Sequence, residues 1–264
     1  MGNAYFSLID EDDRRARYFA GAATGGPWDP GLQHGGPPNA LAVREAERAI
    51  FAETGRTDLT ALRVAAEFVH PVPVGEVDTQ TQVLRAARSA ALVEVAISAG
   101  NRPCLFARVW FVRSSDTSVI APPLGEPSAV PDVPPGLDVS FPYGSSLEWR
   151  FIKNQMGAPG PAAAWVRPTT QLLDGEDVTG LARVALIADS ASGLSSELDW
   201  SVWSFLNVDL DIHLARSVEG EWLLMDAATQ FGPAGSALAR STLSDVRGVV
   251  GSSLQTLVVA PLPG

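Results

Sequence analysis

The first half of the chain contains one stretch with a helical period of apolar residues, followed by several stretches in which apolar and polar residues alternate. In the segment 39–52 the apolar side chains fall within one arc about 120° wide when successive residues are placed 100° apart. This pattern predicts a helix, which follows a loop rich in glycine and proline. Four β-strands are then predicted from two-residue alternation, at residues 62–69, 76–87, 90–99 and 104–112.

The second half repeats this order. A helix is expected at 178–192, with Asp177 as its N-cap and Gly193 just beyond its end. One helix with several antiparallel strands, occurring twice, predicts an α+β fold in which each sheet wraps its own helix and the two sheets pair along their edges. The strands predicted in this half are 149–152, 163–166, 202–214, 222–229, 237–243 and 254–259.

A proline-rich segment separates the two halves. Residues 115–144 contain seven prolines, which remove hydrogen-bond donors and keep the backbone extended. We therefore expect an N-terminal domain at 1–114, a linker at 115–144 and a C-terminal domain at 145–264.

Composition narrows the range of partners. The 264 residues include 30 acidic and 19 basic side chains, so the net charge is −11 and nucleic acid is an unfavourable partner. No apolar run is long enough to cross a bilayer, and the N-terminus lacks the features of a secretory signal. The single cysteine, Cys104, allows no internal disulfide. We expect a cytoplasmic protein that binds neither membranes nor nucleic acid.

Several short sequence motifs, which follow one another in a fixed order along the chain, carry a resemblance to a known family. Together they resemble the acyl-CoA thioesterase II-like (TesB-like) double hot-dog superfamily, and most closely an actinobacterial-type subgroup. The resemblance implies two antiparallel sheets, each wrapping one long helix, paired into one continuous sheet. The motifs are Trp-Asp-Pro at 28–30, Gln-His-Gly-Gly-Pro-Pro at 33–38, Ala-Asp-Ser at 188–190, Phe-Leu-Asn-Val-Asp-Leu at 205–210 and Gly-Glu-Trp at 220–222.

The resemblance also implies an activity and a set of site residues. Members of this superfamily hold the attacking water with an Asp, a Thr and a Gln, which fall here on Asp189, on Asn207 and near Ser244. Only the Asp is unchanged. The implied substrate is an acyl thioester of coenzyme A or of an acyl carrier protein, with no cofactor. A homodimer or larger assembly is expected.

Two of these segments suit thioester hydrolysis on chemical grounds. Asp189 lies among small and apolar neighbours on its predicted helix, as suits a general base, although a helix-rim carboxylate bound to backbone or solvent has the same local sequence. His34, Gly35 and Gly36 precede the first helix, whose free N–H groups could stabilise an oxyanion. An ordinary glycine-rich loop with a surface histidine is the alternative.

Other polar residues favour structural roles. Asn207 shares a strand face with Asp209, Asp211 and His213, which is typical of a solvent-facing surface. We expect Glu45 and Glu47 to be solvated and the Cys104 thiol to be packed in a strand. The histidines have no partners at metal-ligand spacing, so no metal site is expected. The expected tunnel walls are rich in alanine, valine and leucine, as suits an aliphatic acyl chain.

Two other functions stay open at this point. A hydro-lyase of the enoyl-CoA hydratase or dehydratase type could pair Asp29 with His34, or His34 or His70 with Asp189. A protein that binds acyl thioesters without turning them over is the other alternative, because the Thr and Gln positions are altered.

Overall fold

The computed structural model describes residues 4–121, 129–132 and 141–262. The N-terminal half contains, in chain order, β1 (Ala4–Glu11), β2 (Arg15–Ala20), the 3₁₀ turn η1 (Ala22–Thr24), α1 (Gly36–Thr54), β3 (Leu59–Phe68), β4 (Gly75–Ala86), β5 (Ala90–Ala99), β6 (Arg102–Arg113) and η2 (Ser118–Ile120). The C-terminal half contains α2 (Pro142–Ser145), β7 (Leu147–Lys153), β8 (Ala162–Pro168), β9 (Gln171–Leu173), α3 (Gly180–Ala188), α4 (Ala191–Leu194), β10 (Trp203–Asn207), β11 (Asp209–Leu214), β12 (Leu223–Phe231), β13 (Ser236–Asp245) and β14 (Gly248–Pro261).

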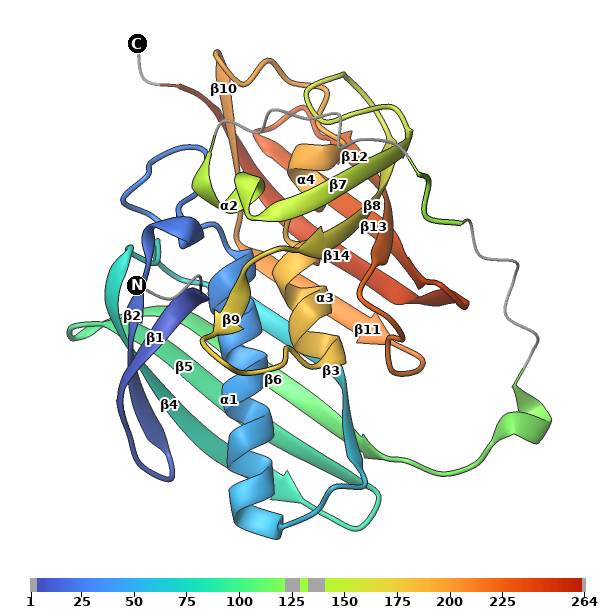
Figure 1. The fold of residues 1–264 in the computed structure, drawn as a ribbon. Coiled ribbons are helices and arrows are strands. Elements are labelled where there is room, and N and C mark those ends of the chain that lie inside the picture. Colours follow the sequence, from blue (N-terminus) through green and yellow to red (C-terminus); the bar gives the residue numbers. More distant parts are fainter. Residues whose placement is uncertain (1–3, 122–128, 133–140, 263–264) are drawn as a thin grey trace.

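The fourteen described strands form one sheet that runs through both halves (Figure 1). Its order is β7-β8-β12-β13-β14-β11-β3-β6-β5-β4-β2-β1-β9, and β10 also pairs with β14. The halves join where β11 runs antiparallel to β3, with Leu210 opposite Ala66. The predicted α+β arrangement with edge pairing is therefore observed, although the division of the chain after residue 114 and before residue 145 stays a prediction.

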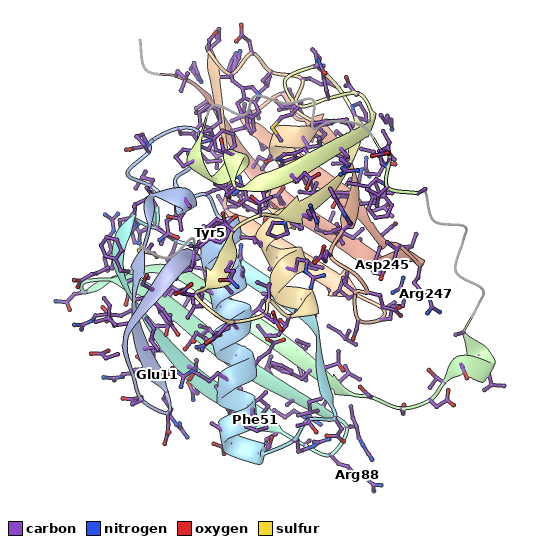
Figure 2. The ribbon with its side chains drawn as sticks, viewed as in Figure 1. Tyr5, Glu11, Phe51, Arg88, Asp245 and Arg247 are labelled. Atoms are coloured by element: carbon purple, nitrogen blue, oxygen red, sulfur yellow. The ribbon has the colours of Figure 1, made fainter. Side chains whose placement is uncertain are left out.

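Helices α1 and α3 lie side by side against this sheet (Figure 1). The apolar arc of α1 that the sequence predicts is buried and packs on β4, β5 and β6. The helix begins at Gly36 rather than at residue 39, because prolines in the first turn need no hydrogen-bond acceptor for their nitrogen. Tyr5 on β1, labelled in Figure 2, is buried and its hydroxyl lies 2.5 Å from Ser146 Oγ, which ties the first strand to the second half.

The second helix and the strand that follows it are both interrupted. Instead of one helix over 178–192, α3 ends at Ala188 and the short α4 begins at Ala191. Thr179, not Asp177, is the residue before α3. The predicted strand 202–214 is divided at Val208 into β10 and β11. Each interruption lies next to the cavity described below.

The sequence analysis did not predict β1, β2 or the short strand β9. Strands β1 and β2 form an antiparallel hairpin, β2 pairs with β4, and β1 pairs in parallel with β9, which is the last strand at this end of the sheet. Within the proline-rich segment 115–144, residues 122–128 and 133–140 lie outside the described residues. Across the described parts of the chain, no helix has the length and apolar character needed to span a membrane.

The expectation that Glu45 is solvated is wrong. Its side chain projects from α1 and is fully buried, with Tyr18 Oη donating to Oε1 (2.6 Å) and Arg48 Nη2 donating to Oε2 (2.9 Å). Arg44 Nη1 also donates to Oε1 (2.6 Å). Burial alone would raise the pKa of this carboxyl, but the hydrogen bonds from the two arginines and the tyrosine hold it below the usual value. The sequence pattern places Arg44 and Arg48 on a solvated face of the helix, but their long side chains reach the buried carboxylate with their guanidinium groups.

Candidate active site

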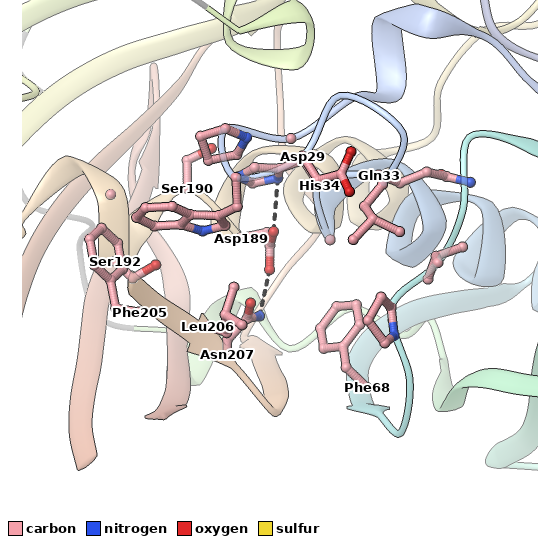
Figure 3. Close-up of a pocket in the computed structure, with 18 of the residues that line it drawn as sticks. Asp29, Gln33, His34, Phe68, Asp189, Ser190, Ser192, Phe205, Leu206 and Asn207 are labelled. Carbon is pink, nitrogen blue, oxygen red and sulfur yellow. Dashed lines mark hydrogen bonds and ion pairs between the residues drawn. The ribbon is translucent and has the colours of Figure 1, made fainter. Parts of the chain in front are cut away.

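A cavity of about 440 Å³ lies between the two halves of the chain (Figure 3). It is bounded by the loop before α1, the end of β3, the break between α3 and α4, and the junction of β10 with β11. Four of the six predicted site residues line it: His34, Gly35, Asp189 and Asn207. The break between α3 and α4 and the break between β10 and β11 therefore both occur where side chains point into the cavity.

Asp189 is the centre of the polar cluster in this cavity. It follows the last residue of α3, and its side chain is 3% exposed. Asn207 Nδ2 donates to its Oδ1 (2.7 Å), and Gln255 Nε2 lies 3.3 Å from the same oxygen. His34 Nδ1 is 2.8 Å from Oδ2. A buried carboxylate is costly unless hydrogen-bonded, and here both of its oxygens have N–H partners.

Asn207 reaches this carboxylate because of an irregularity between two strands. Asn207 is opposite Leu257 of β14, whereas Asp211 is opposite Leu254, so one extra residue is accommodated between these pairs. Such a bulge changes the direction in which side chains point. The prediction that the polar face of this strand is simply a solvent-facing surface is therefore wrong for Asn207, which lies in the cavity (Figure 3).

Ser244 does not line the cavity, and the side chain that lies beside Asp189 is instead Gln255. Ser244 is near the end of β13, opposite Leu224 and Val249, and it is absent from the cavity lining. Gln255 belongs to the next strand, β14, and is fully buried beneath Asp189. The sequence analysis missed this glutamine. The sequence does contain an indication of it. Gln255 is two residues before Leu257, so in a strand the two side chains share the inward face, where a polar residue is unusual.

His34 joins the cluster from the first half. Its ring stacks on Tyr143, with centroids 3.9 Å apart and planes 13° apart, and the tyrosine hydroxyl donates to the carbonyl of Leu186 (2.5 Å). The side chain of His34 is 13% exposed. Asp29, its alternative partner in sequence, instead accepts the N–H of Gly31 in a turn (2.7 Å). The carboxylate that contacts His34 is therefore Asp189.

Two groups compete for His34 Nδ1. Asp189 Oδ2 lies at 2.8 Å, and the N–H of Gly36 points to the same nitrogen at 3.2 Å. A ring nitrogen cannot donate and accept at once, and the shorter contact is to a carboxylate, which makes the stronger hydrogen bond. From this contact we assign the ring hydrogen to Nδ1, which then donates a hydrogen bond to Asp189 Oδ2. In this tautomer the Gly36 N–H, which points to Nδ1, has no acceptor at the amino end of α1.

Gly35 and Gly36 permit a close approach that other residues would block. A Cβ on Gly35 would lie 2.7 Å from Asp189 Oδ2 and 2.6 Å from the ring of Phe68. A Cβ on Gly36 would lie 2.2 Å from the carbonyl oxygen of Leu186 on α3. The two glycines thus bring the start of α1 against the end of α3. Among the described residues, the Gly35 N–H has no hydrogen-bond acceptor.

Aromatic side chains close one part of the cavity. Trp28, Trp200 and Phe205 all line it, and their ring centroids lie 5.2–5.9 Å apart. The expectation of walls made mainly of alanine, valine and leucine is therefore wrong for this part. In the described parts of the chain, no three His, Cys, Asp or Glu residues gather as metal ligands would.

Solved structures define the class of fold to which this chain belongs. Acyl-CoA thioesterase II TesB2 from Mycobacterium marinum is 14% identical, with a TM-score of 0.72 over 97% of this chain and 96% of its own. The tesB protein of Mycobacterium avium is 18% identical, with a TM-score of 0.70 over 96% of each chain. A protein with a hot dog fold from Alicyclobacillus acidocaldarius is 16% identical, with a TM-score of 0.68 over 97% of this chain and 96% of its own. The chain is an α+β double hot-dog protein, as expected.

Family comparison then gives the particular group. The acyl-CoA thioesterase N-terminal domain matches residues 24–112, and the acyl-CoA thioesterase C-terminal domain matches residues 122–259. The chain belongs to the acyl-CoA thioesterase family, of the TesB-like double hot-dog kind. The comparison with curated proteins gave no match.

Proposed function

We propose that this protein hydrolyses acyl-CoA thioesters with a water molecule activated at the Asp189 cluster. The observation that carries the proposal is the approach of two groups from different halves of the chain. The Asp189 carboxylate lies against Gly35, so a Cβ at this glycine would be 2.7 Å from Oδ2. A nucleophilic water beside Asp189 and Asn207 would then attack a carbonyl carbon whose oxygen lies near the N–H groups of Gly35 and Gly36.

The positive end of the α1 dipole suits this role of the glycine amides. Negative charge develops on the carbonyl oxygen when water adds, and amides at a helix N-terminus stabilise it. Pro37 and Pro38 contribute no N–H groups, so Gly35 and Gly36 are the donors at this end of the helix. No covalent enzyme intermediate and no cofactor is needed for this reaction.

The proposal extends to the acyl group. The wall of Trp28, Trp200 and Phe205 supports a compact acyl group, either short or aromatic, rather than a long aliphatic chain. Aromatic rings favour edge-to-face or offset contacts with other rings, and their bulk limits the depth available to a flexible chain. We take coenzyme A as the carrier, with an acyl carrier protein as the alternative.

Steady-state hydrolysis of a series of acyl-CoAs tests the assignment. Loss of a general base or of the group that orients it costs about 10²–10⁴-fold in rate, so Asp189→Ala should lose at least 10²-fold in kcat. Asp226→Ala, at an exposed position on β12, provides the matched control. A folded Asp189→Ala variant with wild-type turnover would show that the assignment is wrong.

A hydro-lyase is the second candidate, and the contact between His34 and Asp189 favours it. A histidine from one half and an aspartate from the other form a pair that could remove and return protons during hydration of an enoyl thioester. Hydration of crotonyl-CoA that is abolished in His34→Ala would support this activity. Tight binding of acyl-CoA with no product from either reaction would instead indicate a non-catalytic binding protein.

Three further expectations belong to the same proposal. The mycobacterial structures similar to this chain support the actinobacterial-type subgroup. Coenzyme A thioesters and a single cysteine support a cytoplasmic location. A homodimer or larger assembly is proposed because exposed apolar side chains outside the cavity occur on the outer face of the sheet, including Leu238 on β13 and Leu254 on β14.

A further inference from the structure

The hydrogen bonds around Asp189 identify a proton acceptor other than its carboxylate. Oδ1 faces N–H groups of Asn207 and Gln255, and Oδ2 faces the protonated Nδ1 of His34. Three donors therefore converge on two oxygens within a buried site. A carboxylate bound in this way is well suited to orient a neighbour and less suited to take a proton from water.

His34 has the opposite arrangement. When Nδ1 carries the proton that Asp189 accepts, Nε2 of the neutral ring holds a free lone pair. Among the described residues, Nε2 has no hydrogen-bond partner, and His34 lines the cavity. The ring is held by stacking on Tyr143, whose hydroxyl is itself fixed on Leu186. Its position and its tautomer are thus both set by the protein.

We propose that Nε2 of His34 is the general base that activates water in this enzyme, with Asp189 as the positioning residue that fixes the ring. This inference rests on the proposed thioesterase function. Water adds to the thioester carbonyl carbon as its proton passes to Nε2. When the C–S bond breaks, the leaving thiolate takes that proton back. The products are a carboxylic acid and the free thiol, and His34 returns to its starting state.

The other titratable groups near this ring are poorer candidates. Burial raises the pKa of Tyr143 well above its ordinary value, so its hydroxyl stays protonated. Asp29 is occupied by the N–H of Gly31. His70 also lines the cavity, but its Nδ1 lies 2.7 Å from the backbone oxygen of Pro103, and no carboxylate of the described residues is in contact with its ring.

The chain has three histidines, so the base can be assigned by single replacements. The experiment measures kcat against pH for wild type and for His34→Gln, Asp189→Asn and His213→Gln. His213 lies on β11 outside the cavity and serves as the control. His34→Gln keeps an N–H donor for Asp189 and removes the basic nitrogen. It should lose at least 10²-fold in kcat and lose the acid limb of the profile, while His213→Gln keeps both.

Chemical rescue provides a second readout that a purely structural role would not give. In His34→Ala, the space beside Tyr143 is open to a free imidazole, which should restore part of the lost kcat in proportion to its concentration. His34→Ala and His34→Gln are compared with wild type by thermal unfolding, so loss of fold is separated from loss of the base. Imidazole should not rescue Asp189→Ala, because the ring of His34 is still present there.

The outcomes separate this inference from the function on which it rests. If wild type hydrolyses acyl-CoAs but His34→Gln keeps its acid limb and loses less than tenfold in kcat, Asp189 is the base and the inference is wrong. If wild type hydrolyses no thioester, the proposed function fails and this inference fails with it. Independently of activity, nitrogen NMR of histidine-labelled protein should show the His34 proton on Nδ1, and a proton on Nε2 alone would contradict the arrangement.

Discussion

The side-chain amide of Gln255 bridges the break in the helix at Asp189. Its Nε2 donates to the backbone oxygen of Asp189 (3.1 Å), and its Oε1 accepts the N–H of Ser192 (3.2 Å). These two backbone groups would otherwise be buried without partners at the point where α3 ends. One side chain from β14 therefore satisfies the interrupted helix and also contacts the carboxylate that the interruption exposes to the cavity.

Replacement of Gln255 should affect stability and activity together. Gln255→Leu keeps the volume but leaves two buried backbone groups unpaired, which should lower the free energy of unfolding by about 1–3 kcal/mol. It should also lower kcat, because Asp189 loses a donor that fixes its position. Urea unfolding and acyl-CoA hydrolysis check both effects. Ser252→Ala, at an exposed position on the same strand, is the control; equal effects in the two variants would contradict this role.

Gly36→Ala should separate α1 from α3. The new Cβ would lie 2.2 Å from the carbonyl oxygen of Leu186, so the backbone of one helix must move. Overpacking of this kind costs about 1–3 kcal/mol of stability, measurable by urea unfolding. At Gly180, the first residue of α3, the nearest atom to an added Cβ is 3.5 Å away, and Gly180→Ala should be neutral or stabilising. A stable Gly36→Ala variant would show that the two helices can move apart freely.

Glu47 should make stability fall as pH rises. Burial raises the pKa of this carboxyl to about 7, although the hydrogen bond from Thr179 opposes the shift. Between the ordinary glutamate value and pH 7, the unfolded chain releases this proton before the folded chain does, so the contribution to stability is lost through that window. Glu47→Gln should therefore be more stable than wild type above pH 7, by about 1 kcal/mol.

Unfolding curves measured from pH 4 to pH 9 would test this, with Glu53→Gln on the exposed end of the same helix as the control. A pH dependence that is the same in wild type and Glu47→Gln would contradict the role of Glu47.

If the proposed function holds, Trp200→Ala should extend the range of acyl-CoAs that the protein hydrolyses. Removal of this indole opens the aromatic wall, and fully burying a CH₂ group is worth about 0.8 kcal/mol, so a longer chain gains affinity with each buried carbon. The ratio of kcat/KM for decanoyl-CoA to that for benzoyl-CoA should rise about tenfold or more. Val202→Ala, in the same loop but outside the cavity lining, is the control. A wild type that already prefers long chains would contradict the compact-acyl proposal.

Residues whose positions depend on local sequence could be predicted. The apolar face of α1 and the segments around His34 and Asp189 could be predicted, because helices, caps and glycine-rich loops depend on residues that are neighbours in the sequence. Gln255 was missed because its place beside Asp189 depends on the register of β13 with β14, which no short segment encodes. Ser244 was chosen instead for its position along the chain.

The burial of Glu45 was missed for a different reason. Its neighbours Arg44 and Arg48 indicate a solvated helix face in sequence, but three donors from the arginines and Tyr18 compensate the cost of burying the carboxylate. Only the tertiary placement of Tyr18, on a strand that the hydrophobic pattern did not predict as such, completes this set.

The site is shared between the halves, since His34 and the glycine amides come from one and Asp189, Asn207 and Gln255 from the other. Each half contributes only part of the polar cluster, and neither half contains all of it. The register between β3 and β11 therefore fixes how the two parts of the proposed site face each other. A shift in this register would displace His34 relative to Asp189 although neither residue had changed.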